Sequence, residues 1–432
     1  MASTELSKTF SASNRKTWTF SAWIKFSSFG GVGLFAAYAD SSNRSYFGIN
    51  GSHQLLLYAQ QSGSDTCSVY STQVFRDPSA WYHIMCVCDT TQSTSTDRVK
   101  FYVNGSQADV TFSHTPDQNE DLYLNGGYEH AVGSRDGSSY FDGLMSHVHF
   151  ADGTAYTPST FGSTDSTTGE WKINTSPTVT YGTNGFFILK DGNSVTDQSG
   201  QSNNFTVGAG TLTNTEDCPS NNFATWNAVD NYYASATLTN GNTKVATNSS
   251  SYSATLTSLG ASSGKFYAEF KLIDKGSGYC QIGIKGKQPT ATSDGVGAGS
   301  DGLAYRKDGY KVLNGSSSTY GTSYDNNDII GIAMDLDNNR LFFSKNGTFQ
   351  DSGDPTSSTG AITIPTSSSG FYFMGISDEH HSGSNTWEAN FGNGYFSTTA
   401  ISSEGTNASG IGKFEYDVPA GYTALSTKGL NE

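Results

Sequence analysis

The sequence predicts an all-β fold arranged as two antiparallel β-sandwiches in tandem. Aromatic residues make up 13% of the chain and charged residues only 15%, a composition typical of short strands joined by turns. No segment shows a 3.6-residue amphipathic period long enough to predict a helix. At 432 residues the chain exceeds what one hydrophobic core usually supports, so we expect two domains.

The first strand-rich block spans residues 1–165. Its segment TWTFSAWIKF at 17–26 alternates apolar and mostly polar side chains, which predicts a half-buried strand. The segment WYHIMCVCDT at 81–90 is apolar on both faces, so we expect a central strand that is covered on both sides.

An Asn-Gly turn at 104–105 predicts a two-residue hairpin within this block. Its register sets Phe101 opposite Ala108 on the inner face. On the outer face the same register sets Lys100 opposite Asp109, which is a favourable cross-strand charge pair.

Residues 166–222 are rich in Ser, Thr, Asn and Gly and predict a connecting segment. The apolar stretch YGTNGFFILKDG within it predicts one added strand, packed on the first block. Residues 223–432 then supply further short strands separated by turns, such as GKFYAEFKL, YCQIGIKG and IIGIAMDLD, and predict the second sandwich.

Two further hairpins are expected in the second block. An Asn-Asn turn after IIGIAMDLD would set Leu336 opposite Leu341 and leave Phe342 on the outer face. The Asn-Gly turn of FFSKNGTF sets Phe343 opposite Gln350.

The composition argues against several classes of function. A formal charge of −15 disfavours a phosphate-binding surface, so we expect no nucleic-acid partner. No apolar run predicts a signal peptide or membrane insertion. We therefore expect synthesis and retention in the cytoplasm, unless the protein leaves by assembly into a virus particle. The five cysteines lack metal-ligand spacing and are expected to be mostly reduced and buried.

Several motifs resemble known families. The order TFSAWIKF, QVFRDPSAWYHIMCVCDTT, DRVKFYVNG and YFDGLMSHVHFADGTAYTPSTFG resembles a laminin-G/concanavalin-A-like lectin domain over nearly all of residues 8–161. The segments SSGKFYAEFKL, IIGIAMDLDNNRLFFSKNG and EANFGNG resemble a SPRY domain, which is also a concanavalin-A-like, jelly-roll-type sandwich. The tandem, ending in GYTALST, is similar to virion proteins of marine tailed bacteriophages: tail fibres, spikes or head-decorating proteins.

This resemblance implies a virion surface protein that recognises host cell-surface polysaccharide through loops at the sandwich rims. It would be synthesised in the host cytoplasm and displayed as a homo-oligomer or in many copies, with other virion proteins as partners. The alternative is a purely structural decoration or connector protein that binds only other virion proteins.

We expect no enzymatic activity. Glycoside hydrolases on concanavalin-A-like folds need two carboxylates that flank the sugar bond, carried on one strand as Glu-x-Asp-x-Glu or a close variant. This chain contains no such run. We also expect no cofactor or metal. Lectin-like sandwiches sometimes hold calcium at the rim, and for that alternative the candidate ligand is Asp142.

Sugar sites combine an exposed aromatic ring with amides and carboxylates, because the ring covers the apolar face of the sugar and the polar groups fix its hydroxyls. Three loops carry that mixture, and for each single residue the alternative is packing within the sandwich or incidental exposure. The neighbouring histidines of the third loop also suit a metal, although a solvated loop tip is commoner. The candidate ligand-binding residues are Arg135, Asp136 and Tyr140 in the first loop, Tyr310, Tyr320, Tyr324 and Asp325 in the second, and Asp378, His380, His381 and Trp387 in the third.

Overall fold

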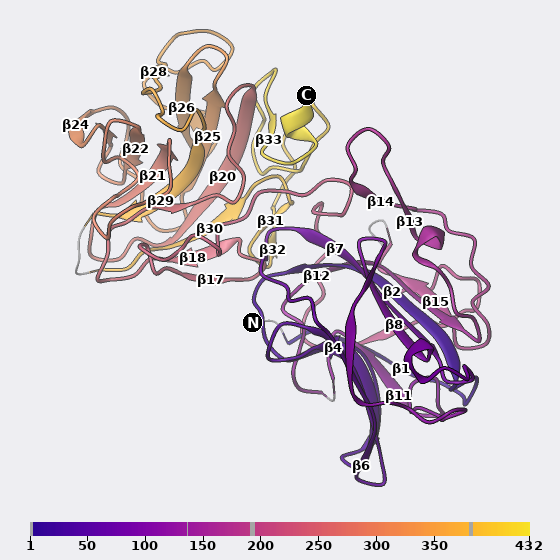
Figure 1. Ribbon diagram of the computed structural model, residues 1–432. Coiled ribbons are helices and arrows are strands. Elements are labelled where there is room, and N and C mark those ends of the chain that lie inside the picture. The colour runs from indigo at the N-terminus through magenta and orange to yellow at the C-terminus, as the bar shows by residue number, and fades with distance from the viewer. Residues whose placement is uncertain (1–2, 136, 191–194, 380–382) are drawn as a thin grey trace. The chain divides into compact units, whose positions relative to one another are not determined.

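The structure, a computed structural model, describes residues 3–135, 137–190, 195–379 and 383–432. The chain divides into two compact units, Met1–Asn214 and Thr215–Glu432 (Figure 1). Apart from short 3-10 turns, every regular element in the described ranges is a β-strand, which confirms the all-β prediction. No helix in those ranges is long and apolar enough to cross a membrane.

The first unit contains two large antiparallel sheets and one small sheet. The eight-stranded sheet has the order β10 (Val110–His114), β6 (Ser64–Ser71), β5 (Leu55–Gln61), β4 (Asn43–Ile49), β3 (Val32–Asp40), β11 (Glu129–Val132), β1 (Glu5–Thr9), β16 (Thr206–Ala209). The six-stranded sheet has the order β15 (Phe186–Ile188), β12 (Gly143–Asp152), β2 (Thr17–Phe26), β7 (Trp81–Asp89), β8 (Val99–Val103), β9 (Ser106–Ala108). The small sheet pairs β13 (Gly162–Thr164) with β14 (Trp171–Ile173), and two 3-10 turns, η1 (Ser95–Asp97) and η2 (Pro158–Thr160), complete the unit.

Aromatic side chains from both large sheets form the core of this unit. Phe20 of β2 stacks on Phe35 of β3 with ring centroids 5.3 Å apart, and Phe47 of β4 meets Phe20 edge-on at 5.7 Å. The alternation in TWTFSAWIKF therefore points one set of side chains into the core, as predicted. All five cysteines of the chain are free, and four of them are buried.

The second face of the six-stranded sheet is also covered, so the prediction that β2 is half-buried was wrong. Its polar-face residues Thr19, Trp23 and Lys25 are at most 5% exposed. The reason is that the chain after β12 returns across this face, where Trp171 stacks on His83 of β7 and donates its indole N–H to His83 Nδ1 at 3.1 Å. The prediction of a central β7 covered on both sides is confirmed.

The hairpin at 104–105 follows the predicted register only as far as Phe101 opposite Ala108. The predicted Lys100–Asp109 pair was wrong. After β9 the chain leaves the six-stranded sheet, and β10 pairs with β6 of the other sheet. Lys100 instead forms an ion pair with Asp97 at 3.0 Å.

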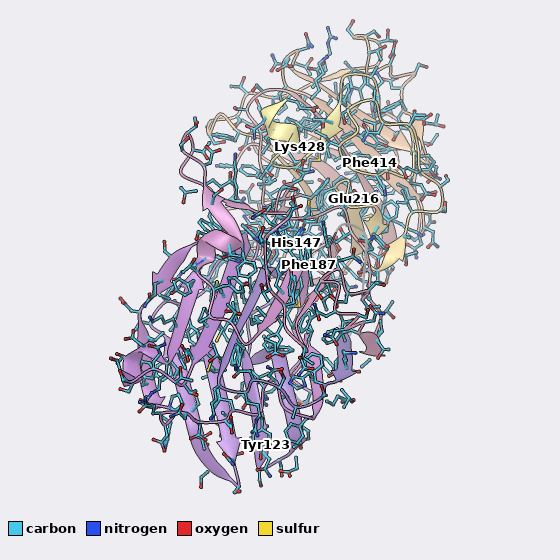
Figure 2. The ribbon with its side chains drawn as sticks, turned by 90° about the vertical axis from the view of Figure 1, so that its right-hand side faces the viewer. Tyr123, His147, Phe187, Glu216, Phe414 and Lys428 are labelled. Atoms are coloured by element: carbon cyan, nitrogen blue, oxygen red, sulfur yellow. The ribbon has the colours of Figure 1, made fainter. Side chains whose placement is uncertain are left out.

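The segment 166–222 holds more regular structure than the single strand expected from its composition. It contributes β14, β15 and β16, and the last two extend the two large sheets of the first unit. Figure 2 labels Phe187 of β15, whose ring lies 5.6 Å from that of His147. Contacts between residues place the division of the chain after Asn214, within this segment.

The second unit repeats the two-sheet arrangement. Its nine-stranded sheet has the order β17 (Thr237–Thr239), β18 (Lys244–Ala246), β30 (Thr386–Asn390), β20 (Lys265–Asp274), β25 (Ile329–Asp335), β26 (Arg340–Lys345), β27 (Thr348–Phe349), with β28 (Ile362–Thr363) paired to β26 and β33 (Thr423–Ala424) paired in parallel to β20. Its six-stranded sheet has the order β19 (Thr255–Leu256), β29 (Phe373–Asp378), β21 (Cys280–Lys285), β22 (Gly302–Arg306), β23 (Tyr310–Leu313), β24 (Ser316–Thr319). The unit also contains a pair of short strands, β31 (Tyr395–Phe396) and β32 (Thr399–Ala400), and the 3-10 turn η3 (Gly429–Asn431).

The β25–β26 hairpin differs from its predicted register. Leu341 lies opposite Met334, and Asp335 lies opposite Arg340, so the connection is four residues long and Leu336 has no strand partner. Asp335 is fully buried and forms an ion pair with Lys265 at 3.2 Å. Asp335 also accepts the backbone N–H of Asn338 at 3.1 Å, a bond that spans the four-residue connection. The next turn follows the prediction, since the Gln350 N–H donates to the Phe343 carbonyl at 2.9 Å.

Residues 405–424, here called the C-terminal strap, cover the outer face of the nine-stranded sheet. Phe414 (Figure 2), Tyr422 and Val418 of the strap pack with Phe342 and Tyr267, and none of these side chains is more than 7% exposed. The prediction that Phe342 lies on the outer face of the sheet is confirmed, and the strap buries it there. As in the first unit, a third layer covers the outer face of a sheet.

One buried carboxylate, Glu269 of β20, anchors the strap. It accepts the backbone N–H groups of Glu415 and Tyr416, both at 2.8 Å, and side-chain bonds from Asn390 and Tyr267 at 3.3 and 3.2 Å. Desolvation by burial raises the pKa of Glu269 to about 7, although these hydrogen bonds favour the ionised form.

We predict that Glu269 makes stability depend on pH. Because its folded-state pKa lies above the ordinary value of 4.5, the folded state binds the extra proton between about pH 4.5 and 7. The free energy of unfolding of the second unit should therefore fall as pH rises through this window, by roughly 3 kcal/mol, and level off above it. The buried histidines, whose lowered pKa values act in the opposite direction, lie in the first unit. Urea unfolding of the full chain at closely spaced pH values, read at the transition of the second unit, measures this slope.

The variant Glu269→Gln should lose the slope, and at pH 5 it should cost about 1–3 kcal/mol because its amide NH₂ faces a backbone N–H donor. Glu404 is exposed and lies directly before the strap. Its variant Glu404→Gln is the matched control and should keep the pH dependence. If the free energy of unfolding of Glu269→Gln still falls over this pH window, the pH dependence comes from another titratable group.

Gly105 gives a second prediction. Its φ of +79° is unfavourable for other residues, and an added Cβ would lie 2.4 Å from the Trp171 ring. Gly63 of the same unit has a φ of +80° with nothing within 4 Å of an added Cβ. We expect Gly105→Ala to destabilise the first unit by about 1–3 kcal/mol more than Gly63→Ala, because only the former also overpacks. Thermal unfolding of the two variants measures the difference, and equal losses would mean that Trp171 does not press on the hairpin.

Candidate functional site

A group of aromatic and charged side chains meets at one end of the six-stranded sheet of the second unit. Arg306 ends β22, and Tyr310 begins β23 beside it. Tyr279 precedes β21 and Glu379 follows β29, and the backbone N–H of Glu379 donates to the Tyr279 carbonyl at 3.0 Å. Because β29, β21, β22 and β23 are neighbours, these strand ends lie together. With Asp308, these residues form what we call the Arg306 site.

The Arg306 guanidinium is held by both carboxylates of the site. Its Nε and Nη2 donate to the two oxygens of Asp308, each at 2.9 Å, in a bidentate pair. Its Nη1 donates to Glu379 at 3.0 Å and to Ser317 at 3.1 Å. The hydrogen bonds to Asp308, followed by the charge of Glu379, raise the pKa of Arg306 further above its ordinary value.

Two tyrosine rings lie against this fixed guanidinium. The Arg306 Cζ is 4.8 Å from the ring centroid of Tyr279 and 5.3 Å from that of Tyr310. The rings remain 40% and 37% exposed, whereas the Arg306 side chain is only 14% exposed. Cation–π contacts of this kind are worth about 0.5–2 kcal/mol, so the rings are positioned before any ligand arrives.

A pocket adjoins the site on the same sheet and shares Glu379 with it. Its empty volume is about 280 Å³, part of which is open to solvent. Gln281 and Ser377 line its strand side, and their side chains accept the N–H groups of Gly297 and Val296 at 3.3 and 3.1 Å. The polar side chains of the sheet therefore hold the opposite wall of the pocket in place.

The arrangement suits binding. Its two carboxylates are occupied with Arg306 and keep free lone pairs as acceptors, and its rings offer partly exposed apolar surface. In the described part of the chain, no group of three or more His, Cys, Asp or Glu side chains is arranged to hold a metal ion.

Of the candidates proposed from the sequence in the second unit, only Tyr310 lies in this site and only Asp378 lines its pocket. Asp378 is itself fully buried. Asp325 is exposed and forms an ion pair with Lys275 at 2.7 Å, which lowers the pKa of Asp325. His380 and His381 lie outside the described residues.

Three of the expected loop aromatics are instead buried, so their assignment as surface ligands was wrong. Trp387 belongs to β30, is fully buried, and donates its indole N–H to Asn385 at 2.9 Å. Tyr324 is 3% exposed, and its hydroxyl donates to the backbone carbonyls of Cys280 and Tyr305. Tyr320 is 8% exposed and packs edge-on against Tyr305. Their hydroxyl and indole groups form hydrogen bonds with other groups of the protein. These three side chains can therefore be buried although their sequence neighbours are polar.

The candidates of the first unit do not form a comparable site. Arg135 lies over the ring of Tyr46, 5.2 Å from its centroid, so the cation covers the aromatic face that a sugar needs. The Tyr140 hydroxyl donates to the Gly137 carbonyl at 2.6 Å. Asp142, the candidate calcium ligand, accepts a hydrogen bond from Ser28 at 2.8 Å. Asp136 lies outside the described residues.

Sequence reasoning did not identify Tyr279, Arg306, Asp308 or Glu379 as site residues. Their positions are a possible signal, because each of these four residues lies within three residues of the end of one of four neighbouring strands. Finding it required the strand order, which the local pattern does not give.

A buried Ser-His pair in the first unit resembles a nucleophile and its base. Ser21 Oγ lies 2.8 Å from His83 Nε2, but His83 Nδ1 accepts the indole N–H of Trp171. The proton of the neutral ring therefore sits on Nε2 and is donated to Ser21, which is the tautomer opposite to that of a general base. Desolvation lowers the pKa of His83 to about 3 and keeps the ring neutral.

A search of curated proteins gave no match. Among solved structures, the SPRY domain of human HERC1 is 16% identical, covers 36% of this chain and 91% of that chain, and has a TM-score of 0.28. A native heptameric SAP-like pentraxin from Limulus polyphemus is 15% identical, covers 43% of this chain and 89% of that chain, and has a TM-score of 0.29. At these TM-scores the similarities carry no functional argument.

The comparison with protein families is more direct. Residues 3–160 match the family described as the Concanavalin A-like lectin/glucanases superfamily, and they fall within the first unit. Residues 265–360 match the SPRY domain, and they include β21, β22 and β23 with Arg306, Asp308 and Tyr310. The chain thus carries a concanavalin-A-like lectin domain and a SPRY domain in tandem.

Proposed function

We propose that this protein is a non-enzymatic recognition protein on the surface of a bacteriophage particle and that its Arg306 site binds host cell-surface glycans. The observation that carries the proposal is the pair of partly exposed tyrosine rings held on a fixed guanidinium beside a pocket. A sugar ring placed on Tyr279 or Tyr310 would find acceptors for its hydroxyl groups in Asp308 and Glu379.

The charge of the protein supports a neutral glycan. The chain has a formal net charge of −15, and both acceptors at the site are carboxylates. A strongly anionic polysaccharide would be repelled by this field, whereas hydroxyl groups donate to carboxylates without such a cost.

The virion setting rests on the resemblance of the tandem, with its GYTALST ending, to virion proteins of marine tailed phages. A single small site binds weakly, and display of many copies on one particle would multiply its avidity. The second candidate function is a structural decoration or connector protein, in which the same rings contact another virion protein. Tyrosine and arginine are the residues enriched at such protein contacts.

The test is binding of the full chain to a glycan array and to polysaccharide from host cells. We expect Tyr279→Ala and Tyr310→Ala each to weaken binding about two- to tenfold, because ring contacts of this kind contribute about 0.5–1.5 kcal/mol. Tyr232→Ala is the matched control, since Tyr232 belongs to the same unit, is 80% exposed and lies outside the site. It should bind like the unsubstituted chain.

Thermal unfolding confirms that each variant is folded. Equal glycan binding by all three variants would remove the Arg306 site from the proposal. Absence of glycan binding, together with stoichiometric binding of the full chain to purified virion proteins, would replace the proposal with the structural alternative.

A further inference from the structure

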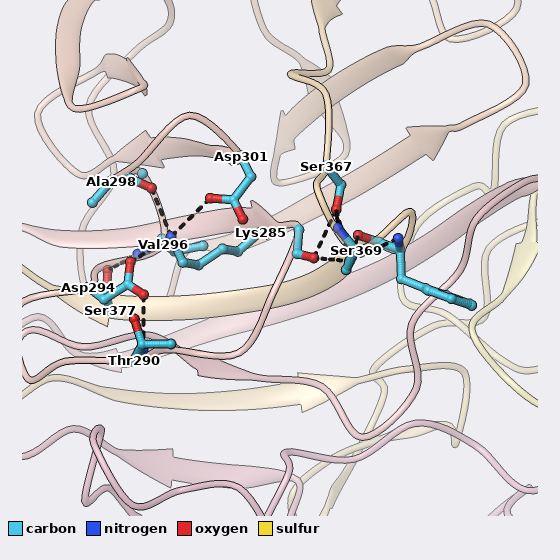
Figure 3. Close-up of polar contacts among 12 residues, drawn as sticks. Lys285, Thr290, Asp294, Val296, Ala298, Asp301, Ser367, Ser369 and Ser377 are labelled. Atoms are coloured by element: carbon cyan, nitrogen blue, oxygen red, sulfur yellow. Dashed lines mark hydrogen bonds and ion pairs between the residues drawn. The ribbon is translucent and has the colours of Figure 1, made fainter.

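A fully buried lysine lies at the far end of β21 from the Arg306 site. Lys285 has no exposed side-chain surface, and its Nζ lies 2.8 Å from Asp294 Oδ1, 3.5 Å from Asp301 Oδ1 and 2.8 Å from the carbonyl oxygen of Ala298 (Figure 3). Asp294 and Asp301 both belong to the connection between β21 and β22. Their side chains are 16% and 5% exposed, so the cluster is nearly removed from water.

From this geometry we propose that Lys285 and Asp294 condense into an intramolecular amide, an isopeptide bond between the two side chains. Burial disfavours an ion pair, because the attraction between the charges rarely repays their desolvation. Condensation removes both charges of the pair. The proposal is independent of the function proposed above.

Asp294 is held as the electrophile. One carboxylate oxygen, Oδ1, contacts the Lys285 amine, and the other, Oδ2, accepts the backbone N–H of Thr290 at 3.2 Å. When Oδ1 carries a proton, attack by the amine on Cγ places negative charge on Oδ2, where the Thr290 N–H is already directed (Figure 3). The amine and the carboxyl group are also held in contact, which removes the entropy cost of an encounter.

Asp301 is placed to carry the protons. Its Oδ1 lies 3.5 Å from Lys285 Nζ, and its Oδ2 is buried with no hydrogen-bond partner among the described residues. An unpaired buried carboxylate oxygen is costly, and a proton on it removes that cost. Asp301 can therefore take a proton from the ammonium group and pass it to Oδ1 of Asp294, so that a neutral amine attacks a neutral carboxyl group and Oδ1 later leaves as water.

The step balances without any oxidant, reductant or co-reactant. The ammonium group of Lys285 and the carboxylate of Asp294 give one amide and one water molecule. The Nζ–Cγ bond forms and the Cγ–Oδ1 bond breaks. Nitrogen keeps one hydrogen, and the other two leave with Oδ1. The amide N–H that remains has an acceptor in place, the Ala298 carbonyl oxygen 2.8 Å from Nζ.

The bond would join the end of β21 to the 286–301 connection, which supplies Gly295, Gly297 and Ala298 to the wall of the pocket described above. It would fix that wall covalently. Val296 of the same wall is already held by Ser377 at 3.1 Å, so the cross-link would reinforce an existing contact.

The test is the intact mass of the purified, denatured full chain. We expect it to be lower than the sequence mass by one water molecule, with no tryptic cleavage after Lys285 and a fragment spectrum that joins Lys285 to Asp294. Lys285→Arg keeps the positive charge but lacks the amine nucleophile, and it should show the full sequence mass. Asp294→Asn should instead lose ammonia, because its leaving group differs.

One side reaction needs its own control. Asp294-Gly295 and Asp301-Gly302 are sequences prone to cyclise to a succinimide, which also loses water. A succinimide would persist in Lys285→Arg and would be cleaved by hydroxylamine, whereas the cross-link would do neither. Asp301→Asn should slow the reaction at least tenfold in a time course after refolding.

The intact mass of the unsubstituted chain tests the proposal even if a variant fails to fold. A folded chain that keeps its full sequence mass after prolonged incubation between pH 5 and 8 would overturn the proposal. A water loss that maps to an Asp-Gly succinimide would overturn it equally.

Discussion

The constraint on which both units depend is that each contains a sheet that is buried on both faces. A sandwich of two sheets covers only one face of each. In the first unit the return of the chain after β12 covers the six-stranded sheet, with Trp171 on His83. In the second unit the C-terminal strap covers the nine-stranded sheet, with Glu269 as its anchor. Each unit is therefore a three-layer body, and each third layer is fastened by one buried polar group with several partners.

The position of the third layer explains where a binding site can form. In the second unit the strap occupies the nine-stranded sheet, and the Arg306 site lies on the other sheet, whose outer face carries the small cluster around Val296 and Val312. The connection that carries Val296 covers part of that face and leaves the pocket beside Glu379. The fold thus leaves Tyr279 and Tyr310 partly exposed where these strand ends meet.

Much of this fold could be predicted from local pattern. The alternation of TWTFSAWIKF, the apolar run of β7, the Asn346-Gly347 register and the first pairs of the Asn104-Gly105 register reflect neighbours in the chain, and the structure reproduces them. The β25–β26 register was not predicted, because Asp335 accepts the Asn338 N–H and the connection has four residues in place of the two expected from Asn338-Asn339. Phe342 was placed on the outer face, as found, but its burial there was not predicted, because its cover comes from the distant strap. The binding site was predicted least well. Trp387, Tyr320 and Tyr324 lie in loop-like sequence but are buried. Tyr279 and Arg306 come together only through the strand order, which local sequence does not give.

The parallel pairing of β33 with β20 has a consequence for synthesis on the ribosome. Phe266 lies beside Thr423 and Tyr267 beside Ala424, so the central strand of the second unit gains its last partner only after residue 424 has been made. The first unit closes earlier, when β16 pairs with β1 near residue 209. During elongation, the first unit is complete while the apolar surface around Phe342 is still uncovered. The nascent chain is therefore most prone to aggregate before the strap has been synthesised.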